Sequence, residues 1–171
     1  GLSPLLIASH KGNMDIVKLL LDIEKININK ANKDGGTPLL IASQNGNTEI
    51  VKLLLDIERI DVNQADNNGL TPLLIASQNG YTEIVKLLLD AKKEIDVNQA
   101  DNNGFTPLYM AAQNGNTEIV KLLLDAKKEI DVNQANKYGA TPLLIASYKG
   151  NTELVKLLLD IEKININKAN K

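Results

Sequence analysis

The chain has 171 residues, of which 43% are hydrophobic and 23% charged, and its formal net charge is −2. This balance excludes an intrinsically disordered chain, which would combine low hydrophobicity with a high net charge. The near-neutral charge and the single arginine, Arg59, disfavour nucleic acid as a ligand, because phosphate recognition relies on clustered basic side chains. No apolar stretch approaches the ~20 residues that cross a bilayer, so we expect no membrane insertion.

Residue types that the sequence lacks also bear on the cellular compartment of the protein and on the chemistry that it could perform. The sequence has no cysteine, and its amino terminus carries no basic and apolar signal segment, so we expect a cytoplasmic or nuclear protein. His10 is the only histidine, which excludes a two-histidine metal site within one chain, and as a lone exposed residue it is interpreted as a surface substitution where the next two units carry Gln44 and Gln78. We therefore expect no enzymatic activity, no cofactor and no metal.

The sequence repeats itself five times. Each copy opens on Ser/Thr-Pro-Leu, and successive openings lie 34, 34, 35 and 35 residues apart. A period of this size is typical of arrays of small helical units. One such unit cannot bury its apolar face alone, so neighbouring units must stack into an elongated solenoid. The openings begin at Ser3, Thr37, Thr71, Thr106 and Thr141.

Each opening predicts a first helix. The Ser or Thr hydroxyl can cap the helix, and proline occupies the first helical position, where its missing N–H is harmless. The apolar run that follows continues to the next glycine or asparagine. The predicted first helices span residues 4–11, 38–45, 72–79, 107–114 and 142–149.

A second helix and a loop complete each unit. In the third unit the helix is predicted from near Tyr81 to Asp90, with Glu83 in the first turn, where the helix dipole favours an anion. Lys86 is left for solvent. The Asp/Asn-Gly segment 101–104 then predicts a tight reversal with positive φ at glycine, and hence a projecting hairpin-like loop. We expect one domain, 1–171, with units at about 1–34, 35–68, 69–103, 104–138 and 139–171.

These residues resemble ankyrin repeats. The family's D-x-x-G-x-T-P-L opening is matched at 66–73 and 101–108, and its G-x-x-E-V-V-K-L-L-L core at 46–55 and in the other four units. The resemblance covers essentially the whole chain. It implies an all-α ankyrin-repeat solenoid of stacked helix-turn-helix units with projecting hairpin-like loops. It also implies a non-enzymatic, intracellular scaffold for protein binding.

The chain departs from the family pattern in two places. The histidine that usually follows Thr-Pro-Leu is replaced, so we expect apolar packing where the family has a polar bridge. The Gly-Ala that usually follows the second helix is missing, which lengthens the period. We expect a longer second helix or a bulged exit, with Ile60, Ile95 and Ile130 tucked under the loop. The residues at the histidine position are Leu6, Leu40, Leu74, Tyr109 and Leu144.

The terminal units lack the polar outer faces that usually close a repeat array. Leu154, Leu157 and Leu158 repeat the interior pattern in the last unit, and residues 3–7 do so in the first. Exposed apolar strips favour association, and contacts between unlike ends need not close into a ring. We therefore expect end-to-end self-association.

The resemblance implies that partners contact the loop tips and the exposed side of the first helices. Phe105 is the only phenylalanine, and a rigid aromatic among amide side chains is typical of an interface anchor. Two interpretations of Phe105 and Leu70 stay open: partner contact, or sideways packing that stabilises neighbouring loops. The candidate partner-binding residues are Leu70, Asn103, Phe105 and Tyr138 in the loops, and Gln78, Asn79, Gln113, Asn114 and Tyr148 on the first helices.

Two functions follow. The first is a protein–protein interaction scaffold that binds a partner protein through its concave loop-tip and first-helix surface. The alternative is a structural or spacer rod, or a designed consensus array, with no specific partner. Near-identity of the units favours the alternative, since the Gln-Asn pair at 44–45 recurs at 78–79 and 113–114.

Overall fold

A computed structural model describes residues 1–126 and 129–168, and within these ranges all regular secondary structure is α-helical. The ten helices follow one another in pairs, and the first helix of each pair begins at the predicted proline. The helices are α1 (Pro4–Lys11), α2 (Met14–Leu21), α3 (Pro38–Gln44), α4 (Thr48–Leu55), α5 (Pro72–Asn79), α6 (Thr82–Asp90), α7 (Pro107–Gln113), α8 (Thr117–Asp125), α9 (Pro142–Tyr148) and α10 (Thr152–Leu159).

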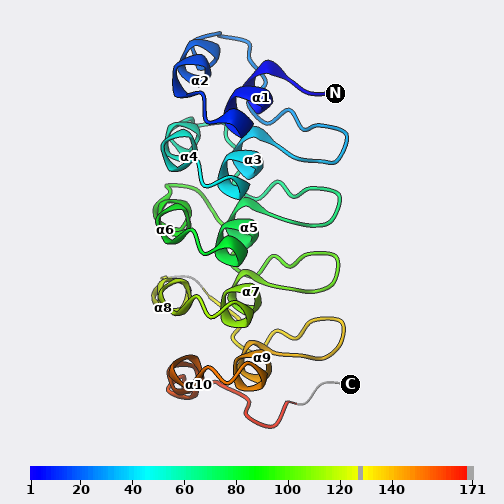
Figure 1. Cartoon of the computed structure of the whole chain (residues 1–171), viewed down its shortest axis with the longest axis vertical. Helices are drawn as coiled ribbons and strands as arrows, with labels where there is room; N and C mark the ends of the chain where they lie inside the picture. The colour runs from blue at the N-terminus through cyan, green and yellow to red at the C-terminus, as the bar shows by residue number, and fades with distance from the viewer. Residues whose placement is uncertain (127–128, 169–171) are drawn as a thin grey trace.

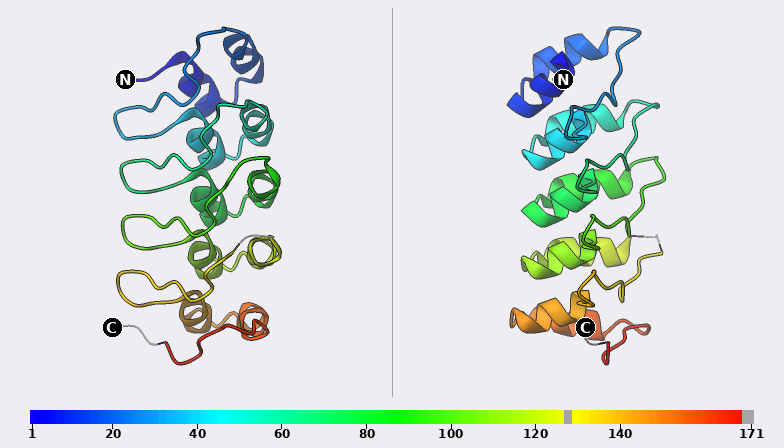
Figure 2. Two further views of the ribbon diagram at one scale, coloured as in Figure 1. Left: turned by 180° about the vertical axis from the view of Figure 1, so that it is seen from behind. Right: turned by 90° about the vertical axis from the view of Figure 1, so that its right-hand side faces the viewer.

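The pairs stack along one axis into an elongated array. The first helices form a central column, the second helices form a parallel column beside them, and the loops between pairs project along the opposite edge (Figure 1). The first and the last helix, α1 and α10, lie in the units at opposite ends of the stack, and the same arrangement is seen from behind and from the side (Figure 2). The predicted solenoid of helix-turn-helix units with projecting loops is confirmed.

Local capping fixes where the first helices begin and end. The Thr71 hydroxyl accepts a hydrogen bond from the N–H of Leu74 at 3.2 Å, and Ser3, Thr37, Thr106 and Thr141 do the same in their units. α5 ends at Gly80, whose φ of 78° is in the left-handed region that favours glycine. Three of the first helices end one residue before the predicted position, and the other two end on it.

The second helices have eight residues in α2, α4 and α10 and nine residues in α6 and α8. α6 and α8 belong to the two units with the 35-residue period, so a longer period goes with a second helix that is one residue longer. Ile60 and Ile95 are only 6% and 5% exposed, and Ile130 is partly buried against the same core. The burial predicted for these isoleucines is therefore confirmed for Ile60 and Ile95, and Ile130 is buried in part.

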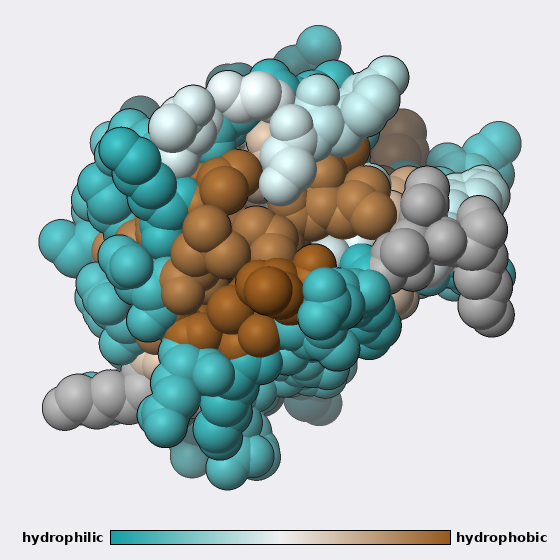
Figure 3. Space-filling view, turned by 90° about the horizontal axis from the view of Figure 1, so that it is seen from below, coloured by the Kyte–Doolittle hydropathy of each residue, from teal (hydrophilic) through white to brown (hydrophobic). Residues whose placement is uncertain are grey.

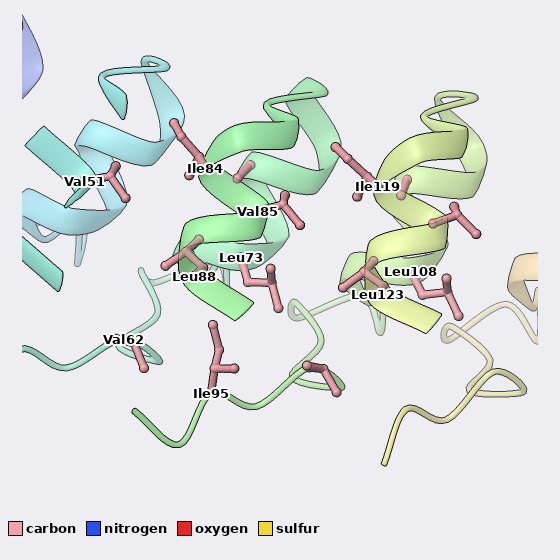
Figure 4. Packing of buried hydrophobic residues seen from close by; sticks show 14 of the residues in the cluster. Val51, Val62, Leu73, Ile84, Val85, Leu88, Ile95, Leu108, Ile119 and Leu123 are labelled. Carbon is pink, nitrogen blue, oxygen red and sulfur yellow. The ribbon is translucent and has the colours of Figure 1, made fainter. Parts of the chain in front are cut away.

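The core runs the length of the stack between the two columns. Ile84, Val85 and Leu88 of α6 are fully buried, and Figure 4 shows Ile84 directed towards α4 while Val85 faces α8. Each second helix thus packs against both neighbours through different side chains. The histidine position is packed as predicted in the four units where it is leucine, with Leu6, Leu40 and Leu74 buried and Leu144 partly buried. Tyr109 is also buried, but its hydroxyl makes a hydrogen bond with Asn136, so a polar contact remains in that unit.

Asparagines link consecutive units by hydrogen bonds that were not predicted from the sequence. The Nδ2 of Asn98 donates to the carbonyl of Glu129 at 2.7 Å, and its Oδ1 accepts from the N–H of Asp131 at 2.8 Å. We call this two-bond contact the asparagine clasp. It recurs at Asn29, Asn63 and Asn133, so every pair of neighbouring units is joined by one.

We expect Asn98→Ala to lower the free energy of unfolding by about 1–2 kcal/mol, because each of its two partly exposed hydrogen bonds contributes about 0.5–1 kcal/mol net. Asn167→Ala is the matched control, since Asn167 occupies the same place in the last unit, which no further unit follows in this chain. Urea denaturation of the two variants checks the difference. Equal losses would mean that the clasp contributes nothing.

The residues predicted to be exposed at the two ends are partly wrong. Leu154 and Leu158 are fully buried, because these positions of a second helix face the preceding unit. At the same end, Leu159 and Ile166 are 48% and 65% exposed instead. At the other end Leu5 and Leu6 are buried by the following unit, while Leu2, Ile7, Ile16, Leu19 and Ile23 are exposed.

Candidate functional site: the loop-tip surface

The loop tips are built by a single acidic or amide side chain in each loop. Asp101 Oδ1 accepts from the N–H groups of Asn103 and Phe105, both at 2.8 Å, and its own N–H donates to the Phe105 carbonyl at 3.0 Å. Gly104, with φ of 83°, makes the reversal. Asn32, Asp66 and Asn136 accept the same pair of hydrogen bonds in their loops. The predicted hairpin-like reversal is therefore stabilised by hydrogen bonds within its own loop.

The tips are also joined to one another. The N–H of Asn102 donates to the Asn68 carbonyl at 2.9 Å, and the N–H of Lys137 donates to the Asn103 carbonyl at 2.9 Å. The side-chain amide of Asn102 adds a bond to the carbonyl of Asn67 at 2.9 Å. Neighbouring loops thus form a continuous row, visible along one edge of Figure 1. Together with the carboxyl-terminal ends of the first helices, this row is the loop-tip surface.

Two of the predicted contact residues are strongly exposed. Tyr138, in the last loop, is 63% exposed, and Tyr148, at the end of α9, is 80% exposed. Exposed rings of this size are costly to leave in water and are enriched in protein interfaces. They are the two most prominent aromatic groups on the loop-tip surface.

Phe105 and Leu70 are partly buried and lie closer to the core. The Phe105 ring stacks on Tyr109 with a centroid separation of 5.0 Å and an interplanar angle of 29°. Phe105 also packs against the main apolar cluster. These contacts are with α7 of the same unit and with the core, so Phe105 packs inward, and the predicted sideways packing on a neighbouring loop stays a prediction.

The amide side chains on the first helices are held by inter-unit hydrogen bonds. Asn114 Nδ2 donates to the carbonyl of Gln78 at 2.7 Å, and Asn79 Nδ2 donates to that of Gln44 at 3.1 Å. Gln78 and Gln113 are partly buried, whereas Asn79, Asn103 and Asn114 are exposed. The side chains of Asn79 and Asn114 are therefore fixed by these bonds and are not freely adaptable. The signal that was available in the sequence is the recurrence of asparagine at the same place in successive units.

The middle of the loop-tip surface carries little charge. Its tips hold Asn67, Asn68, Asn102 and Asn103, and the carboxylates of the two middle loops bond to their own backbones. Charged groups occur towards the two ends of the surface, at Lys33, Asp34 and Lys137 in the tips and at Lys11 and Lys149 on the first helices. Such a surface suits a partner recognised by amide hydrogen bonds and aromatic contacts more than one recognised by ion pairing.

Tyr109, on α7, has a hydroxyl whose pKa is shifted by its surroundings. Burial raises the pKa of its hydroxyl above the ordinary value of 10.0, and a hydrogen bond with Asn136 acts in the opposite direction. Since the raised pKa belongs to the folded state, the neutral phenol stabilises the fold below pH 10 and loses that contribution as the pH rises further.

We expect the wild-type chain to lose stability above about pH 10 more steeply than Tyr109→Phe, because only the wild type must bury a group that ionises there. Thermal melts of both proteins across the alkaline range measure the difference. Parallel pH profiles would show that Tyr109 ionisation is not linked to folding.

The comparison with protein families agrees with this architecture. A model described as ankyrin repeats (3 copies) matches residues 5–101 and 93–170. The stacked helix pairs and projecting loops define a repeat solenoid, and the match covers nearly all of it. The chain belongs to the ankyrin-repeat family. Ankyrin repeats are generally protein–protein interaction modules, and the family is typically non-enzymatic.

A search among curated proteins gives no match. In the described part of the chain, no helix has the length and apolar character needed to span a membrane. In the same residues, no three His, Asp or Glu side chains are grouped as metal ligands.

Proposed function

We propose that the chain is a protein–protein interaction scaffold that binds a partner protein through the loop-tip surface. The observation that carries this proposal is the exposure of Tyr138 and Tyr148, at 63% and 80%, on a row of loops fixed by inter-unit hydrogen bonds. The membership of the ankyrin-repeat family supports the same function.

The physical argument is preorganisation. A tyrosine has few rotatable bonds, and a loop already held by its neighbours loses little further entropy when a partner binds. Tyr138 and Tyr148 supply the apolar contact area in this proposal, with Leu70 and Phe105 as a partly exposed apolar flank. The amides of Gln78, Asn79, Asn103, Gln113 and Asn114 supply the polar contacts.

The asparagine clasps join each unit to the next from the first unit to the last. This unbroken series favours residues 1–171 acting as one domain.

A spacer rod is the second candidate, and one observation favours it. The recurring asparagines of the first helices donate hydrogen bonds from their side-chain amides to neighbouring units, as Asn79 and Asn114 do. Their repetition then has a structural reason and carries no information about a partner. A rod would bind nothing at Tyr138 or Tyr148.

Site-specific photo-crosslinking tests the proposal. A photoreactive phenylalanine analogue replaces Tyr138 in one protein and Lys86, an exposed residue of α6 on the other column, in the control. We expect a discrete protein adduct at position 138 that an excess of unlabelled chain suppresses, and none at position 86. An excess of the Tyr138→Ala, Tyr148→Ala chain should suppress it much less. Absence of a saturable adduct at position 138 would favour the rod.

A further inference from the structure

The fifth unit differs from the middle units at four exposed positions of the loop-tip surface. The tips of the two middle loops hold Asn-Asn, whereas the tip before α9 holds Lys137 and Tyr138. The ends of α3, α5 and α7 carry Gln-Asn, whereas the end of α9 carries Tyr148 and Lys149. We call these two dipeptides the Lys/Tyr pairs. All four side chains are exposed, and they are the places where the surface of the fifth unit departs from the repeated pattern.

The accessibility of these positions is the same in units that are followed by another unit. Lys11, which has the position of Lys149 in the first unit, is exposed although the second unit follows it. The position of Tyr148 is at most partly buried in the units where glutamine occupies it. The corresponding residues of the other loop tips are all exposed, namely Lys33, Asp34, Asn67, Asn68, Asn102 and Asn103. A following unit therefore leaves the Lys/Tyr pairs accessible.

The loop before α9 is built without the carboxylate that the two middle loops use. Asn136 stands in its place, and the Asn136 Oδ1 accepts from the N–H groups of Tyr138 at 2.9 Å and Ala140 at 3.0 Å. The amide makes the same reversal as a carboxylate and leaves no negative charge beside Lys137. The first loop also has asparagine at this place, but Asp34 lies directly beside the lysine of that tip.

The lysines of the Lys/Tyr pairs have no structural partner among the described residues. The position of Lys149 is held in the fourth unit by Asn114, which bonds to the unit before it. The one ion pair in the described ranges joins Lys121 to Glu153, so Lys137 and Lys149 are not paired with a carboxylate. Because the chain as a whole carries a net charge of −2, the Lys/Tyr pairs are local positive sites on a negative protein.

The surroundings of the Lys/Tyr pairs favour a polar partner with some apolar character. Seen from below the stack, hydrophilic and neutral side chains surround an apolar centre (Figure 3). Among the exposed large hydrophobic side chains of the described residues, Tyr138 and Tyr148 are the ones on the loop-tip surface. Each ring is next to a lysine in the chain, so a partner that contacts the ring also comes within reach of an ammonium group.

We infer that the partner of the loop-tip surface presents an acidic segment to the Lys/Tyr pairs, with Asp or Glu carboxylates beside apolar side chains. This inference rests on the function proposed above and adds the chemistry of the partner. Tyr138 and Tyr148 supply most of the contact area, and Lys137 and Lys149 select the charge. Exposed ion pairs add little affinity, but opposite charges accelerate association and disfavour partners of the wrong sign.

An NMR titration of the ¹⁵N-labelled chain with a hexaglutamate peptide tests this charge preference, and hexaglutamine is the uncharged control probe. At low salt we expect saturable shifts of the amide signals of Lys137, Tyr138, Tyr148 and Lys149 with hexaglutamate and none with hexaglutamine. The shifts should disappear at about 1 M salt, where the Debye length is about 3 Å.

Lysine variants locate the binding of hexaglutamate. Lys137→Gln and Lys149→Gln should each weaken it about two- to fivefold. Lys52→Gln and Lys86→Gln, at exposed positions of α4 and α6, are the matched controls and should bind like the wild type. All these lysines are exposed, so the fold is preserved, which melting temperatures verify. Shifts centred on the second helices, equal shifts with hexaglutamine, or the same loss in the control variants would overturn the inference.

The protein captured at position 138 separates this inference from the proposed function. Its affinity should fall about two- to fivefold in Lys137→Gln and in Lys149→Gln, and it should fall as the salt concentration rises. If binding depends on Tyr138 and Tyr148 but on neither lysine nor salt, the acidic segment is wrong and the proposed function stands. If no protein is captured while hexaglutamate still shifts the Lys/Tyr pairs, the proposed function fails and the charge preference stands.

Discussion

Replacing Leu88 by alanine is expected to lower the free energy of unfolding by about 2–5 kcal/mol, as large-to-small substitutions in a close-packed core do. Leu88 is fully buried in α6, the second helix of the middle unit, with a neighbouring unit on each side. Truncation removes its apolar contacts and leaves a cavity that the rigid helices cannot close. Urea denaturation followed by circular dichroism measures the loss.

Leu20→Ala is the matched control for this substitution. Leu20 occupies the same position in α2, but it is only partly buried, because no preceding unit covers it in this chain. Its truncation should cost clearly less than that of Leu88, since part of the leucine surface is already in water. Similar losses at the two positions would contradict the conclusion that the preceding unit buries this leucine.

Gly69→Ala is expected to cost about 2–3 kcal/mol through two effects. The φ of Gly69 is 83°, a left-handed conformation that costs a residue with a side chain about 1–2 kcal/mol. An added Cβ would also lie 2.8 Å from the N atom of Asn102 and 2.9 Å from the Cα of Asp101. The next loop would have to move, which weakens the Asn102 N–H bond to Asn68, a contribution of about 0.5–1.5 kcal/mol.

Gly150→Ala separates the two effects. Gly150 has a similar φ of 70°, but nothing lies within 4 Å of its added Cβ. Only the conformational cost remains there, so its loss of stability should be about 1–2 kcal/mol. Denaturation midpoints of both variants provide the comparison. If Gly69→Ala were no worse than Gly150→Ala, the close contact between adjacent loop tips would not constrain the stack.

Much of the fold could be predicted from the sequence because its signals are local. Thr71 and Pro72 specify the start of a helix by capping and by a fixed φ, and each unit repeats the same signal. Gly104 specifies a reversal in the same local way. Stacking then follows from the period, since a lone pair of short helices cannot bury its apolar residues.

The sequence could not show which neighbour covers each apolar residue. The second helices are apolar over a wide face, so Ile84 and Val85 look equivalent in the sequence, although Ile84 faces the preceding unit and Val85 faces the following one (Figure 4). Only the packed geometry separates them. The end faces were therefore expected, but the residues that form them were partly wrong.

The polar contacts were harder to predict for a different reason. Asn98 and Asn102 are typical turn residues, and a turn explains their presence without any partner. Their inter-unit bonds depend on backbone groups 31 and 35 residues away, which no local pattern reveals. Likewise, the stacking of Phe105 on Tyr109 depends on how the loop folds against α7.

A partner protein that binds the loop-tip surface should depend on Tyr138 and Tyr148. Isothermal titration calorimetry with the protein captured at position 138 measures this dependence, using the variants Tyr138→Ala, Tyr148→Ala and Lys86→Ala. We expect each tyrosine variant to weaken binding by about fivefold or more, equivalent to about 1 kcal/mol, with an unchanged melting temperature. Lys86→Ala should bind like the wild type. Unchanged affinity in both tyrosine variants, or a loss only in Lys86→Ala, would contradict binding at the loop-tip surface.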